Sequence, residues 1–174
     1  MRILITGAAG SGTSTLGAAL AQACGARFLD ADDYFWLPSN PPYRGQRHAD
    51  ERRTLLLQDM AGSPHAVVAG SVMAWGPALE DSFDLVVFLY LPTALRLARL
   101  QAREESRFGH AKPEFLAWAA QYDAGTAQGR SLRGHTDWLA QRQCPVLRLE
   151  GDLSTAERLQ PILALCQPGR AAEG

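Results

Sequence analysis

Short apolar runs alternate along most of the chain with segments in which apolar residues recur at helical spacing. Five runs have the length and composition of strands, at residues 2–6, 27–30, 66–70, 85–91 and 145–150. The runs at 66–70 and 85–91 are apolar without interruption, which is typical of strands buried on both faces of a parallel sheet. Helical spacing is found over residues 14–24, 50–62, 93–107, 113–142 and 154–166. This alternation predicts an α/β fold with a mostly parallel sheet.

Turn-forming residues set the expected ends of these elements. Gly25 is placed to stop the first helix, and Asp50 is placed to cap the second. Residues 37–45 read LPSNPPYRG, which excludes a helix or a central strand. A break in the long helical region is expected near residues 125–129, and residues 169–174 are expected to form a C-terminal tail.

Composition narrows the class of protein. The chain has 174 residues, of which 47% are hydrophobic and 20% charged, as in an ordinary globular domain. The net charge of −1 argues against a nucleic-acid or membrane-surface partner. No stretch approaches the roughly 18 apolar residues of a membrane helix, and the apolar run after Met1 is too short for a signal peptide. The three cysteines, Cys24, Cys144 and Cys166, are far apart, which favours reduced thiols in a cytoplasmic protein.

The strongest motif is GAAGSGTST, which lies between the first expected strand and the first expected helix. Its glycines permit backbone angles that turn successive N–H groups inward, and the start of a helix adds a positive dipole end. The Ser14 hydroxyl stands where a Walker A motif holds Mg²⁺. A tight strand-to-helix turn without a ligand is the alternative. The candidate nucleotide-binding residues are Gly7, Ala8, Ala9, Gly10, Ser11, Gly12, Thr13, Ser14 and Thr15.

The motif departs from a full Walker A sequence at one position. A lysine is usual where this chain has Thr13. That lysine supplies a point charge near the β- and γ-phosphates, so another cation has to replace it or catalysis is weak. Because Lys112 is the only lysine of the chain, the substitute is Lys112 or an arginine.

With this loop, the chain resembles the P-loop nucleoside and nucleotide kinase family, which includes adenylate kinase, cytidylate kinase and shikimate kinase. The resemblance covers about residues 1–152 and is closest to bacterial adenylate-kinase-related proteins with GSGTST and DADDYFW-like segments. It implies a three-layer α/β/α P-loop NTPase fold, with a five-stranded parallel sheet in the order 2-3-1-4-5. It also implies a single domain over residues 1–168 with a short lid at about 107–112.

The segment FLDADD follows the second expected strand, where shikimate-kinase-like proteins have F-x-D-x-D. By this resemblance Asp30 would help Ser14 to organise Mg²⁺ and would contact substrate, while Asp32 would orient or deprotonate an acceptor hydroxyl. A solvated acidic turn that caps the next helix is the alternative. The sequence does not decide which of Asp30, Asp32 and Asp33 faces the phosphates.

Further substrate-binding candidates follow the second and third strands. Arg44 and Arg47 lie on the proline-rich loop and could clamp an anion, although exposed loop arginines are equally expected. Trp36 and Trp75 follow strands at the edge where α/β folds bind ligands, and either could instead belong to the core. The third strand ends in Gly70 and Ser71, without the aspartate of a Walker B motif, and these two residues are also taken as substrate-binding candidates.

Four arginines, spaced by 3, 4 and 4 residues, share one face of the expected helix at 93–107. They are Arg96, Arg99, Arg103 and Arg107. In the kinase family this helix leads to a lid whose arginines reach the ATP phosphates, so Arg103 and Arg107 are catalytic candidates and Lys112 would approach the site. Arg130 and Arg133, on the return side of the lid, are substrate-binding candidates. For Arg96 a solvated basic face is the preferred interpretation.

These features predict an enzyme that binds ATP and Mg²⁺ and transfers the γ-phosphoryl group to a nucleotide or a hydroxylated metabolite. The alternatives are a non-catalytic nucleotide-binding sensor, for which Thr13 marks lost chemistry, and a slow nucleotide hydrolase. The expected partners are a nucleoside triphosphate and a small-molecule acceptor, with no nucleic acid and no membrane. The acceptor, the choice between ATP and GTP, and the choice between monomer and homodimer stay open.

Overall fold

A computed structural model describes residues 1–126 and 129–166. The strands are β1 (Arg2–Gly7), β2 (Arg27–Asp30), β3 (Ala66–Ala69), β4 (Leu85–Tyr90) and β5 (Val146–Glu150). All four pairings are parallel, and the strand order is β2-β3-β1-β4-β5. The predicted fold class and strand order are therefore confirmed.

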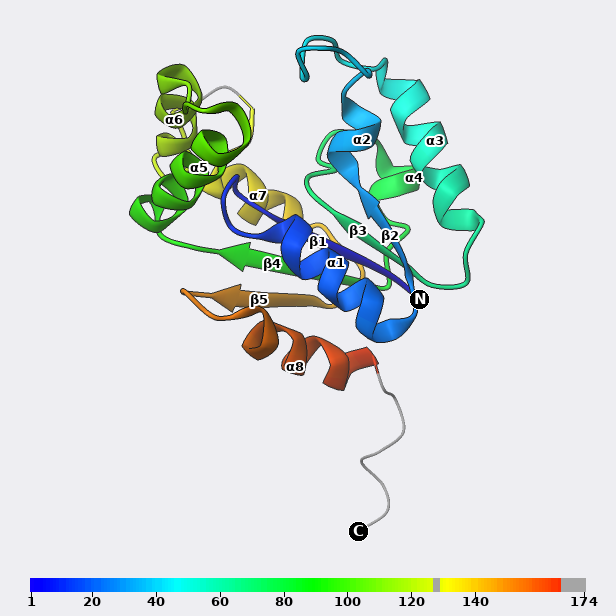
Figure 1. Cartoon of the computed structure of the whole chain (residues 1–174). Coiled ribbons are helices and arrows are strands. Elements are labelled where there is room, and N and C mark those ends of the chain that lie inside the picture. Colours follow the sequence, from blue (N-terminus) through cyan, green and yellow to red (C-terminus); the bar gives the residue numbers. More distant parts are fainter. Residues whose placement is uncertain (127–128, 167–174) are drawn as a thin grey trace.

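Helices connect the strands and cover the sheet (Figure 1). They are α1 (Thr13–Cys24), α2 (Ala31–Phe35), α3 (Ala49–Ala61), α4 (Pro77–Glu80), α5 (Thr93–Phe108), α6 (Pro113–Ala120), α7 (Leu132–Leu139) and α8 (Thr155–Cys166). The short helices α2 and α4 were not predicted, because four or five residues are too few for a hydrophobic period to emerge. The long helical region splits into α6 and α7, with a wider separation than the predicted break. The tail at 169–174 lies outside the described residues.

The predicted helix ends were right at one position and wrong at another. Gly25 does end α1, in a left-handed conformation with φ of 60°. Asp50, however, does not cap α3. The cap is His48, whose Nδ1 accepts a hydrogen bond of 3.4 Å from the Asp50 N–H. Asp50 lies in the first turn, and its carboxylate pairs with Arg53 at 2.7 Å, because an acidic residue there also suits the helix dipole.

Each face of the sheet carries an apolar core, and the central strands contribute side chains to both. Leu4 of β1 packs on the side of α3, α4 and α7, together with Leu56, Trp75 and Trp138. On the other side, Ile3 and Ile5 of β1 pack against α1 and α8 through apolar residues that include Leu16, Leu20 and Ile162. The alternation along β1 follows from the two-residue period of a strand. No helix in the described part of the chain is long and apolar enough to cross a membrane.

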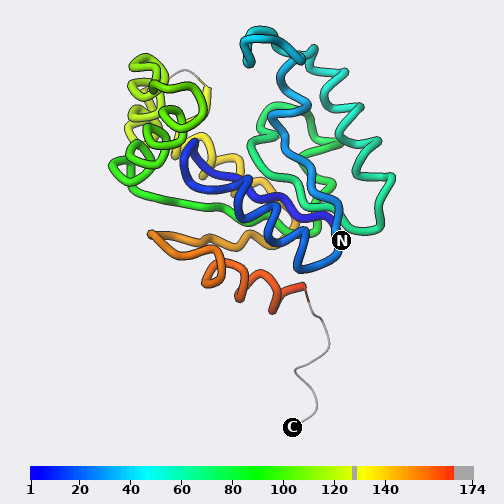
Figure 2. Tube along the Cα trace, in the orientation of Figure 1, coloured from blue at the N-terminus to red at the C-terminus, as the bar shows by residue number. Residues whose placement is uncertain are grey.

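Two groups of elements rise on either side of the carboxyl ends of the strands (Figures 1 and 2). One consists of α2 and the segment 36–47, and the other of α5 and α6. The segment 36–47 is folded back on itself by an antiparallel bridge between Trp36 and Gln46, and the Leu37 N–H donates to the Gly45 carbonyl at 2.8 Å. Residues 7–13 emerge between the two groups, so both can reach a ligand bound there.

Candidate active site

The glycine-rich loop connects β1 to α1 with the backbone that an anion-binding loop requires. Gly10 and Gly12 have φ of 83° and 93°, a region that side chains other than glycine rarely tolerate. A Cβ added to Gly7 would lie 2.5 Å from the Leu89 carbonyl oxygen. The loop therefore needs its glycines for turning and for close packing. The first N–H groups of α1, which begins at Thr13, have no partner within the helix and suit a phosphate.

The Ser14 hydroxyl lies at the mouth of this loop and donates a 2.7 Å hydrogen bond to Asp30 Oδ2. The other carboxylate oxygen of Asp30 accepts the N–H of Asp32 at 3.0 Å and so caps α2. One carboxylate thus fixes both the start of α2 and the hydroxyl of the loop. Among the described residues no group of three or more His, Cys, Asp or Glu side chains could hold a metal. An oxygen pair of this kind suits Mg²⁺, which keeps several waters and takes phosphate oxygens as further ligands.

Asp32 is exposed in the first turn of α2, and Asp30 faces it from the strand end. Desolvation by the surrounding chain and the charge of Asp30 raise the pKa of Asp32, against the opposing influence of Arg130 and Arg103. Both arginines therefore act on Asp32 from the other side of the loop. Desolvation and Asp30 also raise the pKa of Asp33, but no arginine contributes there. Of the three aspartates, Asp30 contacts the loop and Asp32 faces the arginines.

The four arginines of α5 do not share one environment. Arg96 is fully buried, so the prediction of a solvated basic face is wrong for this residue. Arg99 pairs with Asp152, which follows β5. Arg103 pairs with Glu104 at 2.9 Å and is about half exposed. Arg107 lies in the last turn of α5, 5.6 Å from the ring of Phe108.

The region predicted as a lid is partly helical, because α5 continues through Phe108 and α6 begins at Pro113. Lys112 is exposed just before α6. The return side places its two arginines differently. Arg130 lies beside the loop and helps to line a small cavity of about 10 Å³, with Ala8, Ala9, Arg96, Trp118, Ala119 and Tyr122. Arg133, in contrast, has a side chain that is 90% exposed and pairs with Asp137 on its own helix.

The two arginines of the proline-rich loop, predicted as a possible anion clamp, have different surroundings. Arg47 is used internally, since it donates to the Tyr34 carbonyl at 3.0 Å and pairs with Glu51 at 2.7 Å. Arg44 remains exposed at the outer end of the segment. Gly70 and Ser71 follow β3 as predicted, and a Cβ on Gly70 would lie 3.0 Å from the Cβ of Ala31.

Of the two tryptophans predicted near the ligand, one is buried in the core and the other remains partly exposed. Trp75 is buried in the core, where it stacks on Phe35 with ring centroids 6.4 Å apart. Trp36 is half-buried and meets Phe35 and Tyr43 edge to face. Trp36 is therefore the tryptophan that remains near the surface of the site.

Sequence reasoning missed Arg52, on α3. Its guanidinium lies against both stacked rings, 4.7 Å from the centroid of Phe35 and 4.8 Å from that of Trp75. Its Nε is buried without a hydrogen-bond partner in the described part of the chain, and desolvation lowers its pKa. Since Phe35 and Trp75 follow β2 and β3, Arg52 lies at the ligand-binding edge of the sheet. The signal that could have found it is its position, four residues before the buried Leu56 on the core side of α3.

A family model described as "AAA domain" matches residues 3–112, which include the glycine-rich loop, both aspartates and the whole of α5. The chain belongs to this AAA domain family. It is also 42% identical over 171 residues to the uncharacterized protein YqaC of Bacillus subtilis (strain 168), a match covering 92% of this chain and 94% of that protein.

Solved structures with the same fold as this AAA domain include several kinases. A shikimate kinase from Acinetobacter baumannii, in complex with shikimate, superposes with a TM-score of 0.58 at 20% identity, covering 95% of this chain and 92% of that chain. A gluconokinase from Sinorhizobium meliloti 1021 superposes with a TM-score of 0.56 at 23% identity, and the match covers 94% of this chain and 89% of that chain. A deoxyadenosine kinase from M. mycoides with bound dATP superposes with a TM-score of 0.60 at 13% identity, and the match covers 95% of this chain and 99% of that chain. The predicted resemblance to P-loop kinases is confirmed at the level of the fold.

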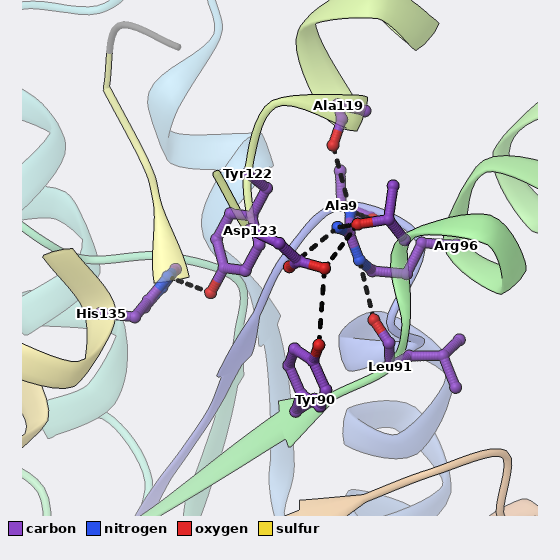
Figure 3. A network of polar contacts seen from close by, with 9 residues as sticks. Ala9, Tyr90, Leu91, Arg96, Ala119, Tyr122, Asp123 and His135 are labelled. Atoms are coloured by element: carbon purple, nitrogen blue, oxygen red, sulfur yellow. Dashed lines mark hydrogen bonds and ion pairs between the residues drawn. The ribbon is translucent and has the colours of Figure 1, made fainter. Parts of the chain in front are cut away.

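In this AAA domain, Arg96 ties the loop to the segment after α6 (Figure 3). Its guanidinium donates to the Leu91 carbonyl at 3.0 Å, the Ala119 carbonyl at 3.2 Å and the Ala9 carbonyl at 3.5 Å. It also pairs with Asp123 at 3.3 Å. The buried charge is thus matched by one carboxylate and several carbonyls, as burial requires.

A buried histidine stands next to this network. His135 of α7 lies with its Nδ1 2.8 Å from the Tyr122 hydroxyl (Figure 3). Its Nε2 is 3.4 Å from Thr6 Oγ1. Desolvation, followed by the charge of Arg130, lowers the pKa of His135 to about 4. The ring is therefore neutral at physiological pH. Because Thr6 precedes the first glycine of the loop, this contact braces the end of β1.

Proposed function

We propose that this AAA domain is a phosphotransferase that moves the γ-phosphoryl group of Mg-bound ATP to a nucleotide or another small hydroxylated acceptor. The observation that carries the proposal is the hydrogen bond between Ser14 and Asp30 beside the glycine-rich loop, with Asp32 two residues further on and bonded through its N–H to the same carboxylate. A loop that only binds nucleotide does not need a second carboxylate that faces arginines across the site.

The loop and the start of α1 would bind the triphosphate through backbone N–H groups. Ser14 and Asp30 would hold Mg²⁺, which neutralises charge on the phosphates and orients the transferred group. Residues 107–112 would act as a short lid over the nucleotide, bringing Arg107 and Lys112 closer to the phosphates.

Asp32 would accept the proton of the acceptor hydroxyl. As the acceptor oxygen forms its bond to the γ-phosphorus, the bond from that phosphorus to the bridging oxygen of ADP breaks, and the proton passes to the carboxylate. The raised pKa of Asp32 makes it a better base than an ordinary aspartate. Arg103 and Arg130, which act on Asp32 from the other side, would stabilise the charge on the phosphoryl oxygens.

Arg52 supplies a reason to expect an anionic acceptor. Its cation lies against aromatic rings and has no carboxylate partner among the described residues. A phosphate or carboxylate group on the acceptor would provide that partner, and a guanidinium binds both kinds of anion in bidentate fashion. Arg44 and Trp36 would add contacts from the segment 36–47, and Gly70 and Ser71 from the end of β3.

The test is ADP release from Mg-ATP by the purified protein with a panel of acceptors. The panel contains nucleoside monophosphates, nucleosides, shikimate, gluconate and similar small alcohols. The proposal expects a large increase with one member, which Ser14→Ala and Asp30→Asn each reduce, whereas Thr54→Ala, an exposed hydroxyl on α3, leaves it unchanged. Clear ATP binding without transfer to any acceptor would favour the sensor function instead.

A further inference from the structure

A second buried arginine lies behind the glycine-rich loop. Arg158 of α8 is 4% exposed. It donates one hydrogen bond to the Ser11 carbonyl, at 2.8 Å, and another to the Gly151 carbonyl, at 3.0 Å. Its Nε is buried without a partner in the described part of the chain. A Cβ built on Gly12 would lie 3.3 Å from Arg158 Nη1, so the guanidinium is in contact with the part of the loop that precedes α1.

The charge of Arg158 is not matched by a carboxylate of its own. Asp152 is the acidic residue that acts on it, and that carboxylate is already paired with Arg99. Arg99 also approaches the loop, since its Nη1 would lie 3.9 Å from a Cβ on Gly12. Glu157, the neighbour of Arg158 on α8, accepts hydrogen bonds from Ser154 instead. Two cations share one carboxylate, which leaves one net positive charge beneath the loop.

Other buried arginines are treated differently. Arg96 is paired with Asp123, and Arg142, whose side chain is 5% exposed, is paired with Asp81 at 2.8 Å and Glu80 at 3.7 Å. A buried cation without a full partner destabilises the fold. For Arg158, desolvation and the charge of Arg99 both disfavour the charged form and lower its pKa. An anion bound by the loop would offset both effects.

We propose that Arg158 supplies, from behind the loop, the fixed positive charge that a lysine at position 13 would supply from within it. The inference rests on nucleotide binding by the loop, which is part of the proposed function, but not on phosphoryl transfer. Arg158 is a positioning residue in this role, because it acts on the phosphates through the backbone of Ser11 and Gly12 and through its field. Its effect should grow with the number of phosphates on the ligand.

The experiment compares the affinities of Mg-ATP, Mg-ADP and adenosine for the full chain and its variants by calorimetry. Arg158→Gln keeps a polar side chain of similar width and removes the charge, so we expect ATP affinity to fall about tenfold or more, ADP affinity to fall less and adenosine affinity to stay the same. Arg158→Lys keeps the charge and should retain the preference for ATP. Arg142→Gln is the matched control, since it removes a buried arginine that has no contact with the loop.

A double variant separates charge from shape. Adding Thr13→Lys to the Arg158→Gln variant should raise ATP affinity by a larger factor than adding it to the unaltered chain. The reason is that the Arg158→Gln variant lacks the cation of Arg158, whereas the unaltered chain has it. Equal losses for ATP and adenosine, no rescue by Thr13→Lys, or loss of the ATP preference in Arg158→Lys would each overturn the proposal. If the unaltered chain binds no ATP, both this inference and the proposed function fail. If it binds ATP but transfers to no acceptor, only the kinase proposal fails.

Discussion

The nucleotide side and the acceptor side of the site differ in how far hydrogen bonds from buried side chains hold the backbone in place. On the nucleotide side, Arg96 and Arg158 hold carbonyls of the glycine-rich loop, and His135 braces the strand that leads into it. On the acceptor side, Arg52 has no polar partner among the described residues and Asp32 is exposed. The loop is therefore already shaped for its ligand, whereas the acceptor side has unpaired groups that a ligand would satisfy.

This difference shows where affinity and specificity are expected to arise. A preformed loop loses little conformational freedom when it binds phosphate, so nucleotide binding should tolerate changes on the opposite side. Unpaired groups on the acceptor side discriminate strongly, because a ligand that fails to pair them leaves them desolvated. Substitutions on the two sides should consequently affect different measurements.

The largest effect is expected from Asp32→Asn, which removes the proposed base while keeping the side chain's size. Phosphoryl transfer should fall about 100-fold or more, and ATP affinity should change little because the loop is untouched. Steady-state rates and ATP titration measure the two quantities. Asp33→Asn, one residue further along α2, is the matched control. A large loss in that variant instead would assign the base to Asp33.

Arg96→Met tests the nucleotide side. It leaves Asp123 and the carbonyls of Ala9, Leu91 and Ala119 without their buried cation, so we expect the free energy of unfolding to fall by about 3–5 kcal/mol. Urea denaturation measures this change. Arg107→Met, at an exposed position at the end of α5, should stay within about 0.5 kcal/mol of the unaltered chain. A small effect at Arg96 would show that the loop does not depend on the buried network.

A third prediction concerns acid stability. The pKa of His135 is lowered to about 4 in the folded chain, from an ordinary value near 6.5, so the unfolded chain binds the proton first as the pH falls. The neutral His135 ring therefore contributes its full share to the free energy of unfolding above about pH 6.5. This contribution should decrease between about pH 6.5 and 4, by about 3 kcal/mol in all. Urea midpoints across this range measure the decrease. His135→Gln should flatten this part of the profile, and His110→Gln, at an exposed position, should leave it unchanged.

The smallest effect is expected from substitutions of Arg52 and Arg44 on the acceptor side, and it shows which of the two arginines binds the anionic group of the acceptor. Arg52→Met should raise KM for an anionic acceptor about tenfold or more, with kcat and the KM for ATP nearly unchanged. Arg44→Met should change the same KM less, because Arg44 lies at the exposed outer end of its segment. The reverse ranking would show that the segment 36–47 moves to hold the anion.

The sequence was informative wherever a signal is local. Continuous apolar runs predict the buried central strands, and glycines followed by hydroxyl residues predict the loop and the start of α1. Both interpretations of the acidic segment find a contact in the structure, because Asp30 accepts a hydrogen bond from Ser14 and also caps α2. The pair of Arg47 and Glu51 has a local signal too, an i,i+4 spacing across the start of α3, but Arg47 was considered only together with Arg44, as a possible anion clamp.

The buried cations could not be predicted, because their partners are distant in the sequence. The Arg158 guanidinium bonds the Ser11 carbonyl across 147 positions, and Arg96 bonds the Ala9 carbonyl across 87. A backbone carbonyl carries no residue-type signal. Arg96 also shares its helical face with three exposed arginines, so the spacing alone makes it look solvated. Only the packing of α5 and α8 against the loop distinguishes these positions.

The contact between Arg158 and Ser11 has a consequence for protein synthesis. Residues 7–15 leave the ribosome well before α8, but the charge behind them belongs to α8, and β1 must also wait for β3 and β4 to pair on its two sides. A nascent chain stalled before α8 would display the complete loop sequence without its cation. On this proposal, bound nucleotide can stabilise the domain fully only once α8 has been synthesised and packed behind the loop.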